Sequence, residues 1–177
     1  GLFAALVERN GAISLHDNRR QRDALESRAL TLLRDGGSRD YLAYAAEQGR
    51  LRVAESRTEA KAQLVADWWR QAASDLKGTV MIAYRRSDVA ELNRVARTLL
   101  EREGRLGPER LGLDSGLELA LGERVLCTRN DRTLGVCNGQ RGTVVAVNGD
   151  ERTLVVELDD RRRLTMPARY LHAGHVS

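Results

Sequence analysis

Residues 135–147 read GVCNGQRGTVVAV, and this stretch indicates how the C-terminal part of the chain folds. Asn138-Gly139 is typical of a tight turn, and the β-branched run after it is typical of a strand. Gly139 and Gly142 permit backbone geometry that a Cβ atom would obstruct. The stretch therefore predicts a turn followed by a strand, and it leaves open whether the turn also binds a ligand.

Alternation of apolar and polar residues with a period of two continues around this stretch, from about residue 118 to residue 171. The runs ERVLCTR, TVVAV, TLVVEL and RRLTM belong to it. Asn148-Gly149 separates two of these runs and Asp159-Asp160 another, and both pairs are hairpin turn signals. Four or five short strands over 118–171 predict a small antiparallel β-barrel.

The first part of the chain, residues 1–107, has helical periodicity instead. We predict helices over 24–34 and 39–48 and a brief strand over 51–53. Ser56-Arg57-Thr58-Glu59 is a capping-box pattern that opens a further helix. That helix carries Trp68 beside Trp69; these rings could stack on bases, but on a helix stripe they are more often core residues.

Residues 79–84, TVMIAY, are a short continuous apolar run. Such a run suits a strand that is buried on both faces of a parallel sheet. A polar turn follows, and then a helix that ends at Gly104, with its apolar stripe formed by Val89, Leu92, Val95, Ala96 and Leu99. Strand, turn and helix in this order predict an α/β fold for 1–107, joined to the barrel by a Gly- and Pro-containing linker over 108–117.

Composition sets limits on the classes of protein and site. The 177 residues are 42% hydrophobic and 31% charged, with a net charge of +4 and only two lysines among the basic residues. Arginine suits phosphate recognition, although codon bias in a GC-rich genome gives the same composition. The N-terminal stretch predicts no secretory signal, and no apolar run is near the ~20 residues of a membrane helix. Cys127 and Cys137 fit no metal-site spacing and indicate a reduced, cytoplasmic pair.

No arrangement of residues in the sequence predicts a complete catalytic site. The histidines, His16, His172 and His175, have no further metal ligands at suitable spacing. The P-loop pattern G-x-x-x-x-G-K-[ST] is absent. We therefore expect no metal site and no ATP hydrolysis by this chain alone.

Three stretches resemble the second RecA-like lobe of superfamily 1 DNA helicases of the RecD type. LHDNRRQ, residues 15–21, resembles motif IV at Leu15, Asn18, Arg20 and Gln21. VMIAYRRSDVAELNRVAR, residues 80–97, resembles a strand and helix of that lobe. Residues 122–147 resemble the SH3-like barrel inserted in it, at Gly122, Glu123, Arg124, Val125, Asn130, Asp131, Gly135, Val136, Asn138, Gly139 and Gly142. The whole run is most similar to the helicase region of conjugative relaxases of the TraA/TrwC type.

This resemblance implies a partial RecA-like lobe over 1–107, an SH3-like barrel over 118–171 and a return to the lobe at 172–177. It implies that the chain is a piece of a parent ATP-dependent helicase that translocates on single-stranded DNA and unwinds duplex. The parent would use ATP and Mg²⁺, and none is expected on this piece. Expected partners are single-stranded DNA, the missing first lobe of the parent, and relaxosome or repair proteins.

The resemblance also implies site residues. Arg20 would contact the γ-phosphate of ATP, and Arg19 stands where relatives often carry an aromatic residue beside the base. Arg85, Arg86 and Ser87 would meet a DNA phosphate at a helix N-terminus, or Ser87 would simply cap that helix. The barrel would turn four polar groups towards DNA: Arg129, Asn130, Asn138 and Arg141.

Two other readings remain open from the sequence. NGQRGTVVAV also looks like the KOW-type turn, G-x-x-G-x-V, of modules that bind RNA or protein without catalysis. Alternatively, the barrel is a passive domain that docks another subunit. Affinity for a protein but none for nucleic acid would favour that reading.

Overall fold

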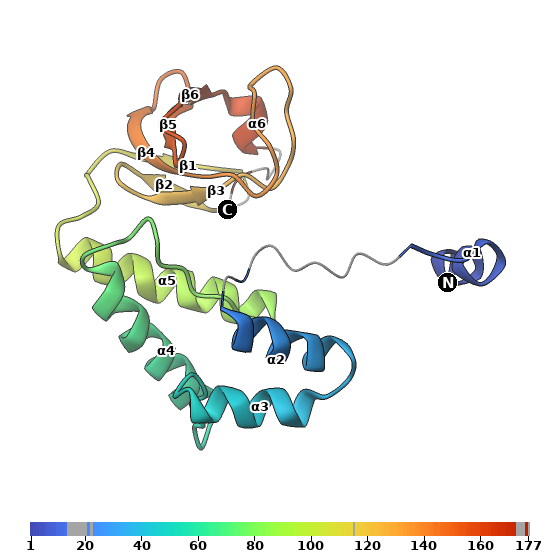
Figure 1. The fold of residues 1–177 in the computed structure, drawn as a ribbon. Coiled ribbons are helices and arrows are strands. Elements are labelled where there is room, and N and C mark those ends of the chain that lie inside the picture. The colour runs from blue at the N-terminus through green and yellow to red at the C-terminus, as the bar shows by residue number, and fades with distance from the viewer. Residues whose placement is uncertain (14–20, 22, 115, 173–175, 177) are drawn as a thin grey trace. The chain divides into compact units, whose positions relative to one another are not determined.

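The computed structural model describes residues 1–13, 21, 23–114, 116–172 and 176, and it divides the chain into two units, Gly1–Glu55 and Ser56–Ser177 (Figure 1). Each unit is described by itself. The predicted domain boundaries at 107 and 118 remain a prediction.

The first unit contains three helices, α1 (Leu2–Asn10), α2 (Ala24–Arg34) and α3 (Ser38–Glu47). Helix α2 begins where Asp23 accepts a hydrogen bond from the Glu26 N–H (2.9 Å), which satisfies one otherwise free donor of the first turn. The predicted helices over 24–34 and 39–48 are therefore confirmed. The strand predicted over 51–53 is wrong, because these residues are coil and exposed, with no neighbouring strand in the described part of this unit.

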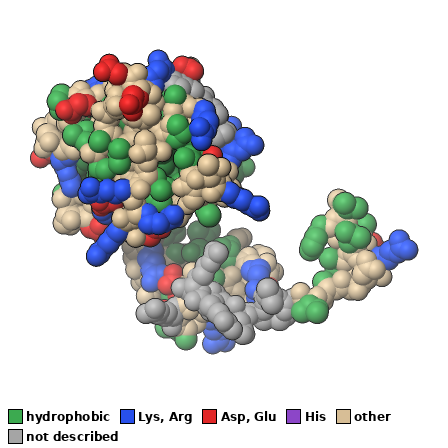
Figure 2. All heavy atoms as spheres, turned by 90° about the horizontal axis from the view of Figure 1, so that it is seen from above, with side chains coloured by type: hydrophobic (Ala, Val, Ile, Leu, Met, Phe, Trp, Pro, Cys, Tyr) green, Lys and Arg blue, Asp and Glu red, His purple; other side chains and the backbone are tan. Residues whose placement is uncertain are grey.

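Little apolar surface is buried in the first unit. Ala29 of α2 and Ala45 of α3 are its buried residues among those described, and α1 has none. Leu2 and Phe3 of α1 are each 80% exposed, and the space-filling view shows apolar side chains covering this helix (Figure 2).

The second unit begins with two helices that pack side by side, α4 (Arg57–Ala72) and α5 (Arg86–Arg102) (Figure 1). The predicted capping box is confirmed, since Ser56 accepts from the Glu59 N–H (3.1 Å). Trp68 is buried, as expected of a core residue, and its ring centroid lies 5.8 Å from that of Trp69. Lys61 of α4 forms ion pairs with Glu91 and Asp88 of α5.

The strand predicted over 79–84 is wrong for the structure described. These residues are irregular, and their side chains alternate between partly buried and exposed, with Val80, Ile82 and Tyr84 58%, 83% and 101% exposed. A strand requires neighbouring strands that accept and donate its backbone hydrogen bonds. No described strand lies between residues 1 and 109, so the parallel sheet predicted for this part is absent from the residues described.

The rest of the second unit, residues 105–176, is named here the β-module. Four strands form an antiparallel meander in the order β3 (Arg124–Leu126), β4 (Arg141–Asn148), β5 (Thr153–Leu158) and β6 (Arg163–Met166). The four predicted runs thus form strands. Hairpin turns at Asn148-Gly149 and Asp159-Asp160 are confirmed, and a bulge bends β4 between Val144 and Ala146.

A hairpin of β1 (Arg110–Gly112) and β2 (Glu118–Ala120) packs against β4. Strand β1 lies within the range predicted as a linker, where its three residues are too short to show a period. The segment after β2 joins β4 through hydrogen bonds of Gly122 N–H and Glu123 O with Val144 (2.8 and 2.9 Å). The described ladder does not close on itself, because β3 and β6 are its outer strands. The module is therefore an antiparallel sheet with a packed hairpin.

The apolar core of the chain lies in the β-module. Its fully buried side chains include Leu154, Val156 and Leu158, which alternate along β5 and so point to the same face of the sheet. Helix α6 (Ala168–His172) closes the core with Tyr170 and Leu171. The burial of alternate side chains on one face of the sheet therefore agrees with the period-two alternation of apolar and polar residues in the sequence.

Candidate functional site

The loop between β3 and β4, residues 127–140, holds most of the predicted DNA-facing residues of the module, and hydrogen bonds fix its shape. Asp131 and Val136 exchange both backbone hydrogen bonds (2.9 and 3.0 Å), which forms a small hairpin within the loop. The Asp131 carboxylate also accepts from the backbone N–H groups of Thr133 and Leu134 (2.8 and 3.0 Å). Val136 of this hairpin is buried in the core and Leu134 packs against it, so hydrogen bonds and apolar contacts together order the hairpin.

The turn at Asn138-Gly139 is held in a similar way. Asn130 Oδ1 accepts from the Asn138 N–H at 2.7 Å, and Gly139 N–H donates to Cys127 O at 2.8 Å. Gly139 has a φ of +89°, in the left-handed region that favours glycine. The predicted turn is therefore confirmed, and Asn130 has a structural task in forming it.

Tyr170 of α6 holds the start of the β3–β4 loop in place through a hydrogen bond. Its hydroxyl donates to Arg129 O at 2.8 Å, and the side chain is 1% exposed. Burial, together with the neighbouring Cys127 thiol, raises the pKa of Tyr170 to about 12. The phenol therefore stays protonated and remains a hydrogen-bond donor over the whole physiological range.

Tyr170→Phe should lower the free energy of unfolding by about 1 kcal/mol, because it deletes the hydrogen bond to Arg129 O and keeps the ring packing. Urea unfolding followed by circular dichroism measures the change. Tyr84→Phe is the control, since Tyr84 is fully exposed and should change stability little. Equal stability of the two variants would contradict a role of the hydroxyl in holding the loop.

The structure places the predicted residues of the module on or beside this loop. Arg129, Asn130 and Asn138 are exposed within it. Arg141 begins β4 and lies 3.6 Å from Asp159, which also receives two hydrogen bonds from Arg124 (2.7 and 2.9 Å). These contacts, chiefly the hydrogen bond from Arg124, lower the pKa of Asp159 and keep it ionised. Arg141 therefore has a carboxylate beside it that competes with any phosphate.

Arg85, Arg86 and Ser87 lie together at the start of α5, and all three are exposed. Arg85 is the N-cap residue and makes no side-chain capping bond, so the reading of Ser87 as the cap is wrong. Ser87 already has helical backbone as the second residue of α5, whereas a capping residue is extended. The free N–H groups of this first turn favour an anion. Arg85–Ser87 and the β3–β4 loop belong to different elements.

The predicted ATP-contacting residues, Arg19 and Arg20, lie outside the described residues, as do His16 and His175. Within the described ranges, no group of His, Cys, Asp and Glu could hold a metal ion. None of the helices in those ranges is long and apolar enough to cross a membrane.

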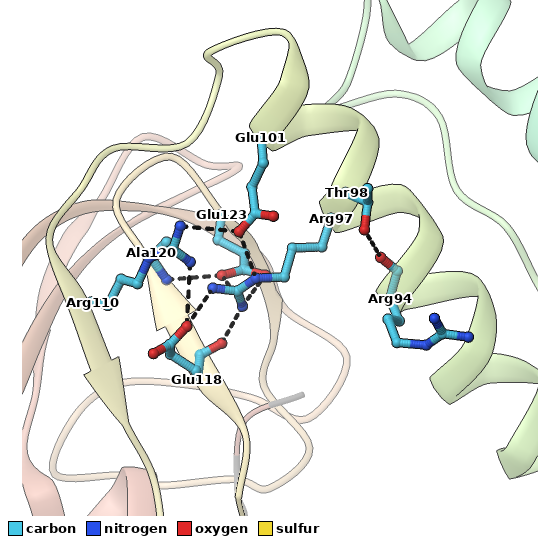
Figure 3. Close-up of polar contacts among 8 residues, drawn as sticks. All are labelled: Arg94, Arg97, Thr98, Glu101, Arg110, Glu118, Ala120 and Glu123. Carbon is cyan, nitrogen blue, oxygen red and sulfur yellow. Dashed lines mark hydrogen bonds and ion pairs between the residues drawn. The ribbon is translucent and has the colours of Figure 1, made fainter.

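An ion-pair cluster joins α5 to the β1–β2 hairpin (Figure 3). We name it the Arg97 cluster; its members are Arg97, Glu101, Arg110, Glu118 and Glu123. Arg97 donates to both Glu123 oxygens (3.1 and 3.0 Å), to Glu118 Oε2 (3.1 Å) and to Glu118 O. Arg110 pairs with Glu101 and Glu118 (3.0 and 3.3 Å). Two arginines thus bridge three carboxylates from the helix and the hairpin.

Glu123 is the most enclosed carboxylate of this cluster, with 15% of its side chain exposed. Burial raises its pKa, against the lowering effects of the Ala120 N–H (2.8 Å) and the Arg97 guanidinium. Sequence reasoning matched Glu123 to a family motif without giving it a task and did not identify Arg97 as its partner. The available signal in the sequence was that Arg97 lies among the apolar positions of α5. Nothing in the neighbouring sequence indicated which residue its side chain contacts.

No family model matches the chain. Among curated proteins it is similar to a probable conjugal transfer protein TraA of Sinorhizobium fredii, with 31% identity over 172 residues, which are 95% of this chain and 15% of that protein. The conjugal transfer protein TraA of Agrobacterium fabrum is 31% identical over 171 residues, 95% of this chain and 16% of the relative. The chain therefore spans about a sixth of the length of these relatives.

Among solved structures, the chain is similar to the Pif1 helicase from Bacteroides in complex with ADP-AlF3 and single-stranded DNA. The identity is 17% and the TM-score 0.47, with 85% of this chain and 32% of that chain covered. A complex of Bacteroides Pif1 with ADP-AlF4 has 18% identity and a TM-score of 0.42, with 84% and 32% covered. The sequence relationship, which extends over 95% of the chain, confirms the predicted resemblance to conjugal transfer proteins of the TraA type.

Proposed function

We propose that this chain is part of the ATP-dependent DNA helicase region of a TraA-type conjugal transfer protein, and that it guides single-stranded DNA. The observation that carries this proposal is the similarity to TraA proteins over 95% of the chain, which includes all three motif-bearing stretches. In the whole protein, residues 1–107 belong to a second RecA-like lobe and residues 118–171 are its SH3-like insert.

Each part has a proposed task. Arg20 contacts the γ-phosphate of ATP, whose transfer its charge stabilises, and Arg19 lies beside the nucleotide. ATP and Mg²⁺ are used only by the whole protein, since the P-loop pattern is absent from this chain. Residues 79–84 become a strand when other segments of the lobe pair with them. Their exposed Val80, Ile82 and Tyr84 support this role, because strand pairing and packing would cover them.

DNA contact is proposed for the start of α5 and for the β3–β4 loop. Arg85 and Arg86 are exposed beside the free N–H groups of a helix N-terminus, which suits a phosphate. Arg129, Asn130, Asn138 and Arg141 lie on or next to a loop whose shape is fixed before any ligand binds. Such a surface holds the sugar–phosphate backbone without reading base sequence.

Fluorescence anisotropy of labelled oligo-dT, titrated with the chain at low and moderate salt, tests the proposal. We expect salt-sensitive binding, because each phosphate contact contributes about 0.7 to the slope of log affinity against log salt. Arg85→Ala/Arg86→Ala should reduce that slope by about 1.4. Arg94→Ala removes an exposed charge from the middle of the same helix and is the control.

Absence of binding at low salt would contradict DNA contact by this chain. Binding of a protein partner without any nucleic-acid affinity would instead favour the passive docking domain. Preferential binding of RNA over oligo-dT would favour the KOW-type module.

A further inference from the structure

We propose that Arg132 and Arg161 form a phosphate-binding site for single-stranded nucleic acid, where the β3–β4 loop meets the β5–β6 turn. The inference rests on the proposed function and specifies its site with two residues that no sequence motif indicates. Arg132 lies in the small hairpin of the loop, and Arg161 lies in the turn between β5 and β6. Both side chains are exposed.

Arg162 holds the two segments together. Its Nη1 donates to Gly135 O in the loop at 2.9 Å, while its Nε donates to Asp160 Oδ2 in its own turn at 2.9 Å. Gly135 N–H in turn donates to Arg132 O at 3.3 Å. Arg161 directly precedes Arg162, and the Arg132 carbonyl accepts from the Gly135 N–H. The two arginines therefore lie on the two sides of the contact between Arg162 and Gly135.

Four other arginines near this contact are engaged by carboxylates. Arg124 and Arg141 share Asp159, Arg163 pairs with Glu157 at 3.0 Å, and Arg162 pairs with Asp160 at 2.9 Å. Within the described ranges, the side chains of Arg132 and Arg161 form no hydrogen bond or ion pair. Their charges therefore remain available to an external anion, whereas a phosphate would have to compete with Asp159 for Arg141.

The backbone of Arg161 has an unusual conformation for an arginine. Its φ is 71°, in the left-handed region that glycine and asparagine adopt at least cost. An arginine in this position is strained, and strain of this kind is typical of functional sites. Arg152 has a similar φ, 51°, in another hairpin turn but pairs with Asp114, so the backbone conformation does not by itself mark a binding site. The proposal rests on the exposed side chains of Arg132 and Arg161, which have no carboxylate partner among the described residues.

The chemistry of the surroundings points to the phosphate backbone as the group recognised. Tyr170 is the only aromatic residue of the β-module, and it is buried and bonded to Arg129 O. Among its described residues, the module therefore presents no Phe, Tyr or Trp ring on which a base could stack. Hydrogen bonds within the loop already fix its shape, so binding pays little to order it.

Arg132→Ala/Arg161→Ala tests the site in the same oligo-dT titration of the full chain. We expect the salt slope to fall by about 1.4, corresponding to two lost phosphate contacts, with equal weakening for oligo-dT and for a mixed-sequence strand. Arg152→Ala is the matched control. Arg152 is also an exposed arginine with positive φ (51°) in a hairpin turn, but it pairs with Asp114 at 3.4 Å.

Arg161→Gly separates binding from folding. Glycine relieves the left-handed strain, so thermal unfolding should stay unchanged or rise by about 2 °C, while the salt slope falls by about 0.7. A structural role alone would give the opposite pattern, with a lower unfolding temperature and unchanged binding. This variant also decides the question if the double alanine variant fails to fold.

The possible results separate this inference from the proposed function. Wild-type affinity in Arg132→Ala/Arg161→Ala and in Arg161→Gly, with weakening in Arg85→Ala/Arg86→Ala, would overturn the site and leave DNA binding in place. No binding of oligo-dT by the wild-type chain at low salt would overturn both. Weakening in the Arg152→Ala control as large as in the double variant would show a general charge effect and overturn the site.

Discussion

Arg97→Ala should lower the free energy of unfolding of the second unit by about 3 kcal/mol, the lower end of the cost of breaking a buried ion pair. The Arg97 side chain is 19% exposed and the Glu123 side chain 15%, so the pair is enclosed but still reached by water. The substitution leaves the Glu123 carboxylate with the Ala120 N–H but without its cation. Urea unfolding measures the loss, with Trp68 and Trp69 fluorescence reporting on α4.

The pH dependence of this loss identifies its cause. Burial already raises the pKa of Glu123, and removal of Arg97 should raise it further. A carboxylate whose pKa is higher in the folded state is destabilising when ionised and costs nothing once protonated in both states. The stability difference between Arg97→Ala and wild type should therefore shrink as the pH falls from 7 towards 4.

Arg94→Ala is the matched control, because it lies one turn away on the same helix and points away from the cluster (Figure 3). An exposed substitution of this kind should change stability by at most about 0.5 kcal/mol. A loss in Arg97→Ala that is equal to that of the control, or independent of pH, would contradict the coupling of α5 to the hairpin through Glu123.

Gly122→Ala should destabilise the β-module by about 2 to 5 kcal/mol, through two effects that add. Gly122 has a φ of +87°, which costs a residue with a Cβ about 1 to 2 kcal/mol. Its Cβ would also lie 2.5 Å from Arg105 O, a backbone atom that can retreat only by moving the chain after α5. Overpacking of this kind costs about 1 to 3 kcal/mol.

Gly139→Ala separates these two effects. Gly139 has nearly the same φ, +89°, but nothing lies within 4 Å of its ideal Cβ position. This variant should therefore show the backbone cost alone, about 1 to 2 kcal/mol. Chemical denaturation of both variants gives the comparison. Equal losses would show that the chain accommodates a Cβ at Gly122 and that only the backbone conformation requires glycine there.

Part of the candidate site could be predicted from the sequence alone. The Asn138-Gly139 turn was predictable, because a positive φ is a local property of one dipeptide. The capping box at Ser56 and the alternation along β4 and β5 were predictable for the same reason. Arg129, Asn130 and Asn138 lie on one exposed loop and Arg141 begins β4, while contact of these residues with DNA stays a prediction. The sequence did not show that the Asn130 side chain is used by the Asn138 N–H.

The sequence by itself determined the turns, the helix starts, the strand runs of the β-module and the relationship to TraA proteins. Each depends on residues a few positions apart or on the order of motifs along the chain. The tertiary structure decided what depends on distant partners. Residues 79–84 are apolar enough for a strand, yet they form none among the described residues because a ladder needs neighbours. Likewise, Arg97 and Glu123 are 26 residues apart, and only folding shows which arginines meet a carboxylate and which remain available to an anion.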